Sequence, residues 1–221
     1  MDSGAREVGP FSSTHGNYTS GDKKFLYSGM LGSGIASVSF LAALEFYLSA
    51  FPLGYIIVND YMFNYSFVYG LFIPFSAPFL AAGYYGLSKK YHQELLRAAA
   101  GITILPFVLS IYGIAVLIAW FNVVAFALMH FPALYIIIVN SVLVGIGFNK
   151  AHAQSFNPGL VRFYALLLIG WNMILIFTQT YNFISFSNPL LILFVVVHHS
   201  LNIVLGILAV YIFYGESRTP S

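Results

Sequence analysis

Ionisable and amide side chains interrupt the apolar stretches of this chain at a few positions. Glu45 falls inside the first stretch, and His198 and His199 fall about ten residues inside the last one. At 1.5 Å per residue, ten residues of helix reach ~15 Å, about half the thickness of a bilayer's hydrocarbon core. Asn202 follows His198 by one helical turn, so these two side chains share a helix face.

Two further asparagines, in the fourth and fifth apolar stretches, lie at comparable depth. Ionisable side chains within a membrane are costly and usually functional, and a carboxylate with a histidine can relay protons or bind a small ion. We therefore predict a binding or proton-relay site in the outer half of the bilayer. Its candidate residues are Glu45, Asn140, Asn172, His198 and Asn202. The alternative is that these side chains only hydrogen-bond across packed helices.

A second interpretation of the histidines is a haem b or other metal site. Bis-histidine haem takes one ligand from each of two facing helices, and His130 with His198 or His199 provides such a pair. The depths of the two ligands agree if the fourth helix starts near Asn122. A start at Pro132 leaves His130 too shallow by roughly 10 Å.

Prolines lie in the middle of the second and third apolar stretches. Pro74 and Pro78 belong to the second, and Pro106 belongs to the third. Each removes a backbone hydrogen bond and can kink its helix. Freed carbonyls near the middle of a bilayer often line a transport site, although a tolerated kink is also common in membrane helices.

The elements that must position these residues are helices long enough to cross a bilayer. Apolar stretches of about 20 residues have this length. We predict six spans, with Phe131 as the expected start of the fourth. They are Phe25–Phe51, Tyr65–Leu87, Leu95–Phe121, Phe131–Phe148, Leu160–Tyr181 and Pro189–Tyr214.

The basic residues predict the orientation of these spans. The chain has nine lysines and arginines, and all of them lie on one side of the predicted spans: before the first span, in alternate connections or the first three residues of the spans that follow them, or after the last span. They are Arg6, Lys23, Lys24, Lys89, Lys90, Arg97, Lys150, Arg162 and Arg218. Basic residues resist translocation, so both ends of the chain and this side of the bundle are expected to be cytoplasmic.

Composition narrows the class of protein. Hydrophobic residues make up 59% of the chain and charged residues 7%, far fewer charges than a soluble domain needs. The net charge of +2 gives no indication of a nucleic-acid partner, and the absence of cysteine excludes thiolate catalysis and disulfides. Common catalytic motifs are missing, so an enzyme is not the favoured interpretation.

We therefore expect an all-α integral membrane protein with six transmembrane helices, the second and third kinked by proline. Residues 1–24 are expected to form a polar mobile tail, 25–214 the transmembrane domain, and 215–221 a short cytoplasmic tail. The expected function is a small-solute or proton-coupled transporter or channel in a cell or other energy-transducing membrane. The alternatives are a haem- or quinone-binding or purely structural subunit of a respiratory or redox complex, and a pore subunit of a translocation machine. Lipid, further copies of the chain or other membrane subunits are the expected partners.

Overall fold

The structure is a computed structural model that describes residues 19–50, 75–120, 123–182 and 190–219. Every regular element in these ranges is helical. The elements are η1 (Ser20–Asp22), α1 (Lys23–Ala50), the helix over residues 75–91, α3 (Glu94–Trp120), α4 (Val123–Ala151), η3 (His152–Gln154), α5 (Pro158–Asn182) and α6 (Leu190–Arg218).

Five of the described helices, α1, α3, α4, α5 and α6, are long and apolar enough to cross a membrane. The chain is therefore a multi-pass α-helical membrane protein. The helix over 75–91 coincides with the C-terminal part of the predicted second span, whose residues 65–74 lie outside the described ranges. The predicted tail residues 1–18 lie outside them as well.

Two helix boundaries differ from the prediction. α4 begins at Val123 and not at Phe131, and Pro132 lies within the helix. Membrane helices tolerate an internal proline because neighbouring groups and small backbone adjustments satisfy the freed carbonyl. α6 continues through Arg218, which brings Glu216 into the helix instead of a polar tail. α3 likewise runs without interruption past Pro106.

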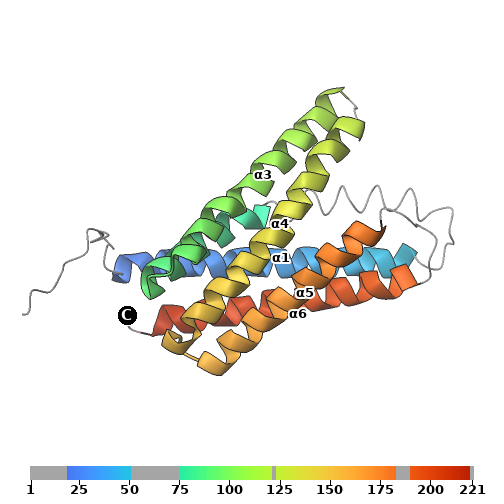
Figure 1. Ribbon diagram of the computed structural model, residues 1–221. Helices are drawn as coiled ribbons and strands as arrows, with labels where there is room; N and C mark the ends of the chain where they lie inside the picture. Colours follow the sequence, from blue (N-terminus) through green and yellow to red (C-terminus); the bar gives the residue numbers. More distant parts are fainter. Residues whose placement is uncertain (1–18, 51–74, 121–122, 183–189, 220–221) are drawn as a thin grey trace, which may run out of the picture.

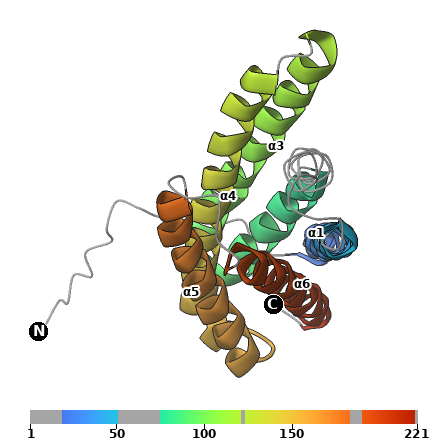
Figure 2. The same cartoon turned by 90° about the vertical axis from the view of Figure 1, so that its right-hand side faces the viewer.

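The helices form a bundle with one hairpin set at an angle to the rest (Figure 1). α1 and α6 lie side by side, and α5 lies beside α6. The hairpin of α3 and α4 crosses this layer, and its turn end stands away from the other helices in both views (Figure 2). The helix over 75–91 lies between α1 and the hairpin.

Small residues allow the close approach of α1 to its neighbours. A Cβ built on Gly29 would lie 2.7 Å from Gly83 Cα, and one on Gly32 would lie 2.7 Å from the backbone nitrogen of Leu80. These glycines therefore let α1 and the helix over 75–91 meet backbone to backbone. Gly29 and Gly32, three residues apart in α1, therefore serve packing within the bundle.

The apolar core sits where the helices converge, at the end of the bundle that carries the basic residues. We call this end the basic end. Its large core side chains come from six helices and are at most 1% exposed: Leu26, Leu87, Leu96, Phe148, Val161, Ile212 and Phe213. The same end holds the connections between helices 75–91 and α3 and between α4 and α5, so the core fixes how these helices start and end.

Candidate functional site

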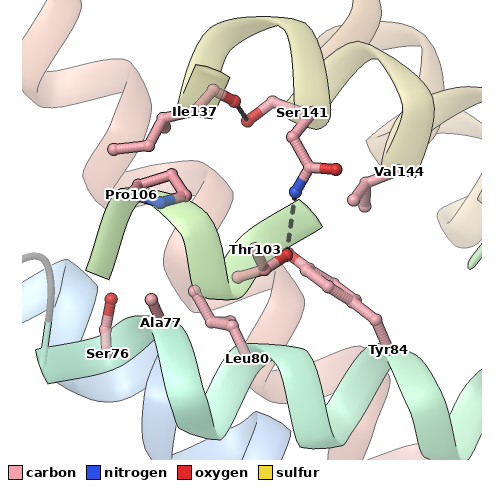
Figure 3. Close-up of a pocket in the computed structure, with 10 residues that line it drawn as sticks. Ser76, Ala77, Leu80, Tyr84, Thr103, Pro106, Ile137, Ser141 and Val144 are labelled. Atoms are coloured by element: carbon pink, nitrogen blue, oxygen red, sulfur yellow. Dashed lines mark hydrogen bonds between the residues drawn. The ribbon is translucent and has the colours of Figure 1, made fainter. Parts of the chain in front are cut away.

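A pocket lies between the helix over 75–91, α3 and α4 (Figure 3). Its volume is about 80 Å³, which is room for several water molecules or a solute of a few non-hydrogen atoms. The described residues that line it are Ser76, Ala77, Leu80, Tyr84, Thr103, Pro106, Ile137, Asn140, Ser141 and Val144.

The polar centre of the pocket is a hydrogen bond between α4 and α3. Asn140 Nδ2 donates to Thr103 Oγ1 over 2.8 Å, the dashed line that reaches Thr103 in Figure 3. Both side chains are buried, and Thr103 in turn donates to the Ala99 carbonyl over 2.7 Å. Asn140 Oδ1 has no hydrogen-bond partner among the described residues. A buried carbonyl oxygen left without a donor costs about 1–3 kcal/mol, so a bound donor from water or a solute would stabilise it.

The remaining walls alternate hydroxyls with apolar groups. Ser141 Oγ donates to the Ile137 carbonyl of its own helix over 2.8 Å, so its oxygen keeps acceptor capacity for the pocket. Ser76 enters from the helix over 75–91, and the ring of Tyr84 reaches from the same helix toward Thr103. Pro106 lies on the α3 wall, where its missing N–H removes the usual donor to the carbonyl one turn earlier.

The electrostatic character of the pocket is neutral. Among the described residues that line it there is no aspartate, glutamate, lysine, arginine or histidine. An ion that entered would lose hydration without meeting an opposite charge, which is costly in a low-dielectric interior. The hydroxyls and the amide can instead replace the hydrogen bonds of an uncharged polar molecule.

The other predicted site residues are placed elsewhere, around α1, α5 and α6. The His198 ring packs between Phe40, with ring centroids 6.1 Å apart, and Trp171, 5.8 Å away. Asn202 Nδ2 donates to the His198 carbonyl over 2.7 Å and lies 3.3 Å from His198 Nδ1. The shared face of His198 and Asn202 is therefore present, but it is separate from the pocket around Asn140.

Glu45 and Asn172 do not line the pocket either. Glu45 is exposed on α1, whereas Asn172 is buried in α5 and donates to the Leu168 carbonyl of its own helix over 2.8 Å. The antiparallel packing of α1 on α6 brings Ser37 against Gly206 and Gly29 against Phe213. Extending this register by two turns of α1 places Glu45 at about the level of His198.

The helices that carry the predicted haem ligands diverge. α4 starts near Asn122, which gives His130 the depth that a pairing with His198 requires. However, the first turns of α4 stand at the far end of the tilted hairpin, while the first turns of α6 lie beside the end of α1 (Figure 1). His199, 1% exposed, packs its ring against those of Phe40 and His198. In the described ranges, no group of three or more histidine or acidic side chains could hold a metal ion.

Sequence reasoning missed the hydroxyl residues of the pocket and the acidic partners of the lysines at the basic end. Lys89 pairs with Asp22 over 2.6 Å, and Lys90 pairs with Glu216 over 2.8 Å. Because the two lysines directly follow an apolar helix, the sequence pattern indicates that they contact lipid headgroups, and it gives no sign of an acidic partner within the protein. The available signal was the apolar pair Ile212 and Phe213 just before Glu216, which predicts that the buried helix face continues to that carboxylate.

No protein family, curated protein or solved structure compared with the chain matches it. The fold and the pocket together define a multi-pass α-helical membrane protein with a small, uncharged and mostly apolar pocket, carrying one amide and a few hydroxyl groups, between three of its helices. That pocket is therefore the feature of the structure that bears on function.

Proposed function

We propose that the protein carries a small, uncharged polar solute across the membrane through the pocket between the helix over 75–91, α3 and α4. The observation that supports this most directly is Asn140, a buried amide that lines the pocket, donates to Thr103 and keeps a carbonyl oxygen for a further donor. An asparagine that serves only packing is expected to have partners for both its amide nitrogen and its carbonyl oxygen, because an unpaired buried polar atom is costly.

The chemistry of the lining supports the choice of solute class. Amide and hydroxyl groups offer both donors and acceptors, and Leu80, Ile137 and Val144 supply apolar walls. This combination fits a compact molecule with one or two hydroxyl or amide groups. Water itself satisfies the same requirements, so a water-conducting pathway is the simplest form of the proposed function.

The proposed topology has six spans, with the basic end in the cytoplasm. The nine basic residues follow the charge distribution of cytoplasmic connections, and the helix over 75–91 belongs to the second span. In this orientation, the pocket is enclosed toward the cytoplasm by the apolar core. Glu45 and His198, at about the same level of α1 and α6, lie on the outer side of the pocket. As a further part of the proposed function, these two side chains couple the movement of protons to the transport of the solute.

The test is solute flux in liposomes that contain the purified protein. Stopped-flow light scattering measures the permeability of water, urea and glycerol relative to protein-free liposomes. We expect permeability to at least one of these above the protein-free level. Asn140→Leu keeps the side-chain size but removes the amide, and it should return the permeability to the protein-free level.

Asn172→Leu is the matched control, because Asn172 is equally buried, lies outside the pocket and donates to the Leu168 carbonyl of its own helix. This variant should keep the flux of the native protein. Native protein that leaves all three permeabilities at the protein-free level would contradict the proposed function. Equal losses in the two variants would show that the flux does not depend on the pocket.

The described residues give no specific support to the haem- or quinone-binding alternative, because the predicted ligand helices diverge. Purification from native membranes tests the other alternative, a structural or pore subunit of a larger complex.

A further inference from the structure

On the side of the basic end, the pocket wall is backed by a layer of packed aromatic rings. Tyr84, which lines the pocket, has its ring centroid 6.4 Å from that of Phe148 and 6.0 Å from that of Phe213. Tyr164 of α5 continues the layer, 5.2 Å from Phe148. All four side chains are buried. We call these residues the aromatic floor, and its rings come from four different helices.

A buried ion pair lies beyond the aromatic floor at the basic end. Lys90 Nζ lies 2.8 Å from Glu216 Oε2, and the two side chains are 5% and 0% exposed. The second carboxylate oxygen, Oε1, accepts a hydrogen bond from the backbone nitrogen of Phe156 over 2.9 Å. Lys90 also donates to the carbonyl of Glu216 and to Thr219 Oγ1, both over 2.7 Å. One carboxylate therefore ties together the helix over 75–91, the α4–α5 connection and the end of α6.

The ion pair and the aromatic floor share their helices. Glu216 follows Phe213 by one turn of α6, and Lys90 follows Tyr84 on the helix over 75–91. Separating Lys90 from Glu216 would therefore free the helix ends that hold Tyr84 against Phe213. The Phe213 ring packs into the notch at Gly29 and Gly83, so the same ring joins α6 to α1 and to the helix over 75–91.

Burial of an ion pair adds little net stability, because the desolvation of both charges offsets their attraction. Removing one partner leaves the other charge buried and strongly favours any arrangement of the helices in which that charge reaches water. An apolar pair would hold the helices at least as firmly without this sensitivity.

We propose that the Lys90–Glu216 pair is the latch of an inner gate, and that the aromatic floor is the barrier which the latch keeps closed between the pocket and the basic end. This inference rests on the proposed function, since the gate controls access to the same pocket. Solute would leave the pocket toward the basic end only when the latch has opened.

The absence of cysteine from the chain makes a direct test possible. Ser141→Cys places a single thiol in the pocket, in exchange for one hydroxyl of the lining and its hydrogen bond to the Ile137 carbonyl. A membrane-impermeant thiol reagent is then added to right-side-out and to inverted vesicles. A separate Lys150→Cys protein, with the thiol exposed at the basic end, identifies the preparation in which the reagent meets that end.

We expect slow labelling of the pocket thiol from the basic end in the otherwise native protein. Glu216→Gln should raise this rate at least about tenfold, equivalent to a shift of about 1.4 kcal/mol in the gate equilibrium. The matched control is Glu94→Gln, which neutralises an exposed glutamate at the same end. Its pair with Arg97 is 3.2 Å long, and the side chains are 64% and 44% exposed. This control should leave the rate unchanged.

A milder variant protects the test against misfolding of Glu216→Gln. Thr219→Val keeps both charges but removes the hydroxyl that Lys90 contacts, and a smaller increase in labelling is expected. Unchanged labelling in the folded latch variants would overturn the gate, as would an equal increase in Glu94→Gln. A pocket thiol that stays unreactive from both sides in every variant would overturn it too.

The result for the gate is independent of the result for the proposed function. Altered labelling in a protein that leaves solute permeability at the protein-free level would retain the gate and reject solute transport. The opposite result is solute flux that depends on Asn140 together with unchanged thiol labelling in the latch variants. This result would retain solute transport and reject the gate.

Discussion

Gly29 of α1 and Gly83 of the helix over 75–91 meet so closely that no side chain fits between them. A Cβ on Gly29 would lie 2.7 Å from Gly83 Cα and 2.6 Å from the ring of Phe213. Three helices therefore share one contact point, just on the basic-end side of the pocket. The closeness matters for function because the position of the helix over 75–91 sets both a wall and the floor of the pocket.

Gly29→Ala should destabilise the protein, because the added methyl group must displace backbone or the buried Phe213 ring. Overpacking of this kind costs about 1–3 kcal/mol. We expect a lower Tm in detergent, measured by size-exclusion chromatography of heated samples. Gly34→Ala is the matched control, since in the described part of the chain no atom beyond the backbone of its own helix turns and its chain neighbours lies within 4 Å of its Cβ position. A Tm for Gly29→Ala equal to that of the control would show that the contact yields without cost.

The sequence was sufficient to predict most of the helices, but less informative about where they meet. The bounds of α1, α3 and α5 and the start of α6 follow the apolar stretches to within about two residues, because lipid requires a long apolar surface. The start of α4 was displaced because no charged residue separates Arg97 from Lys150. Because no charged residues mark the boundary between the two helices, Pro132 indicates a helix start in the sequence, whereas α4 begins at Val123.

The site was harder to predict than the fold, because its residues come from separate helices. Asn140 was identified as a polar residue at depth, but its partner Thr103 is a common residue in membrane helices and gave no signal. The pairing of Lys90 with Glu216 spans 126 residues of sequence and depends on how α6 ends. Pairing across helices is set by tertiary packing, which a single sequence does not encode in any local pattern.

Acid should weaken the attachment of the N-terminal turn to the bundle. The hydrogen bond from Lys89 is the main cause that holds the pKa of Asp22 below its ordinary value of 3.8, and Thr19 adds two further bonds. A depressed pKa in the folded state means that the ionised carboxylate contributes stability above pH 3.8. This contribution is lost as the pH falls through the folded-state pKa.

Asp22→Asn should therefore lower the Tm near neutral pH and lose this disadvantage as the pH is reduced below 3.8. The expected difference near neutral pH is about 1 kcal/mol or less, because Lys89 is partly exposed to solvent. Tm values of both proteins measured across the acidic range test this. A gap in Tm that is constant with pH would indicate that Asp22 acts through its shape and not its charge.

Glu45→Gln tests whether the layer at the level of His198 couples protons to solute. The substitution keeps the size of the side chain and removes its titration. We expect uptake driven by an imposed proton gradient to disappear, while passive exchange of the same solute persists through the unaltered pocket. His152→Gln, at the basic end outside this layer, should leave both activities intact. Gradient-driven uptake that is unchanged in Glu45→Gln would remove this carboxylate from the mechanism.

Gentle purification from native membranes tests whether the chain acts as a carrier or as a subunit of a redox complex. A carrier with a neutral pocket requires no chromophore, so we expect a flat reduced-minus-oxidised visible spectrum and no stoichiometric redox partners. A haem band would contradict the carrier proposal and would make the histidines of α4 and α6 the first residues to replace. In that case the absorbance should be lost in His198→Ala or His199→Ala, and the divergence of the two helices would require each to find its second ligand on another subunit. A colourless protein that always co-purifies with a large assembly would instead indicate that the chain is a subunit of that assembly, and flux should then be measured on the whole assembly.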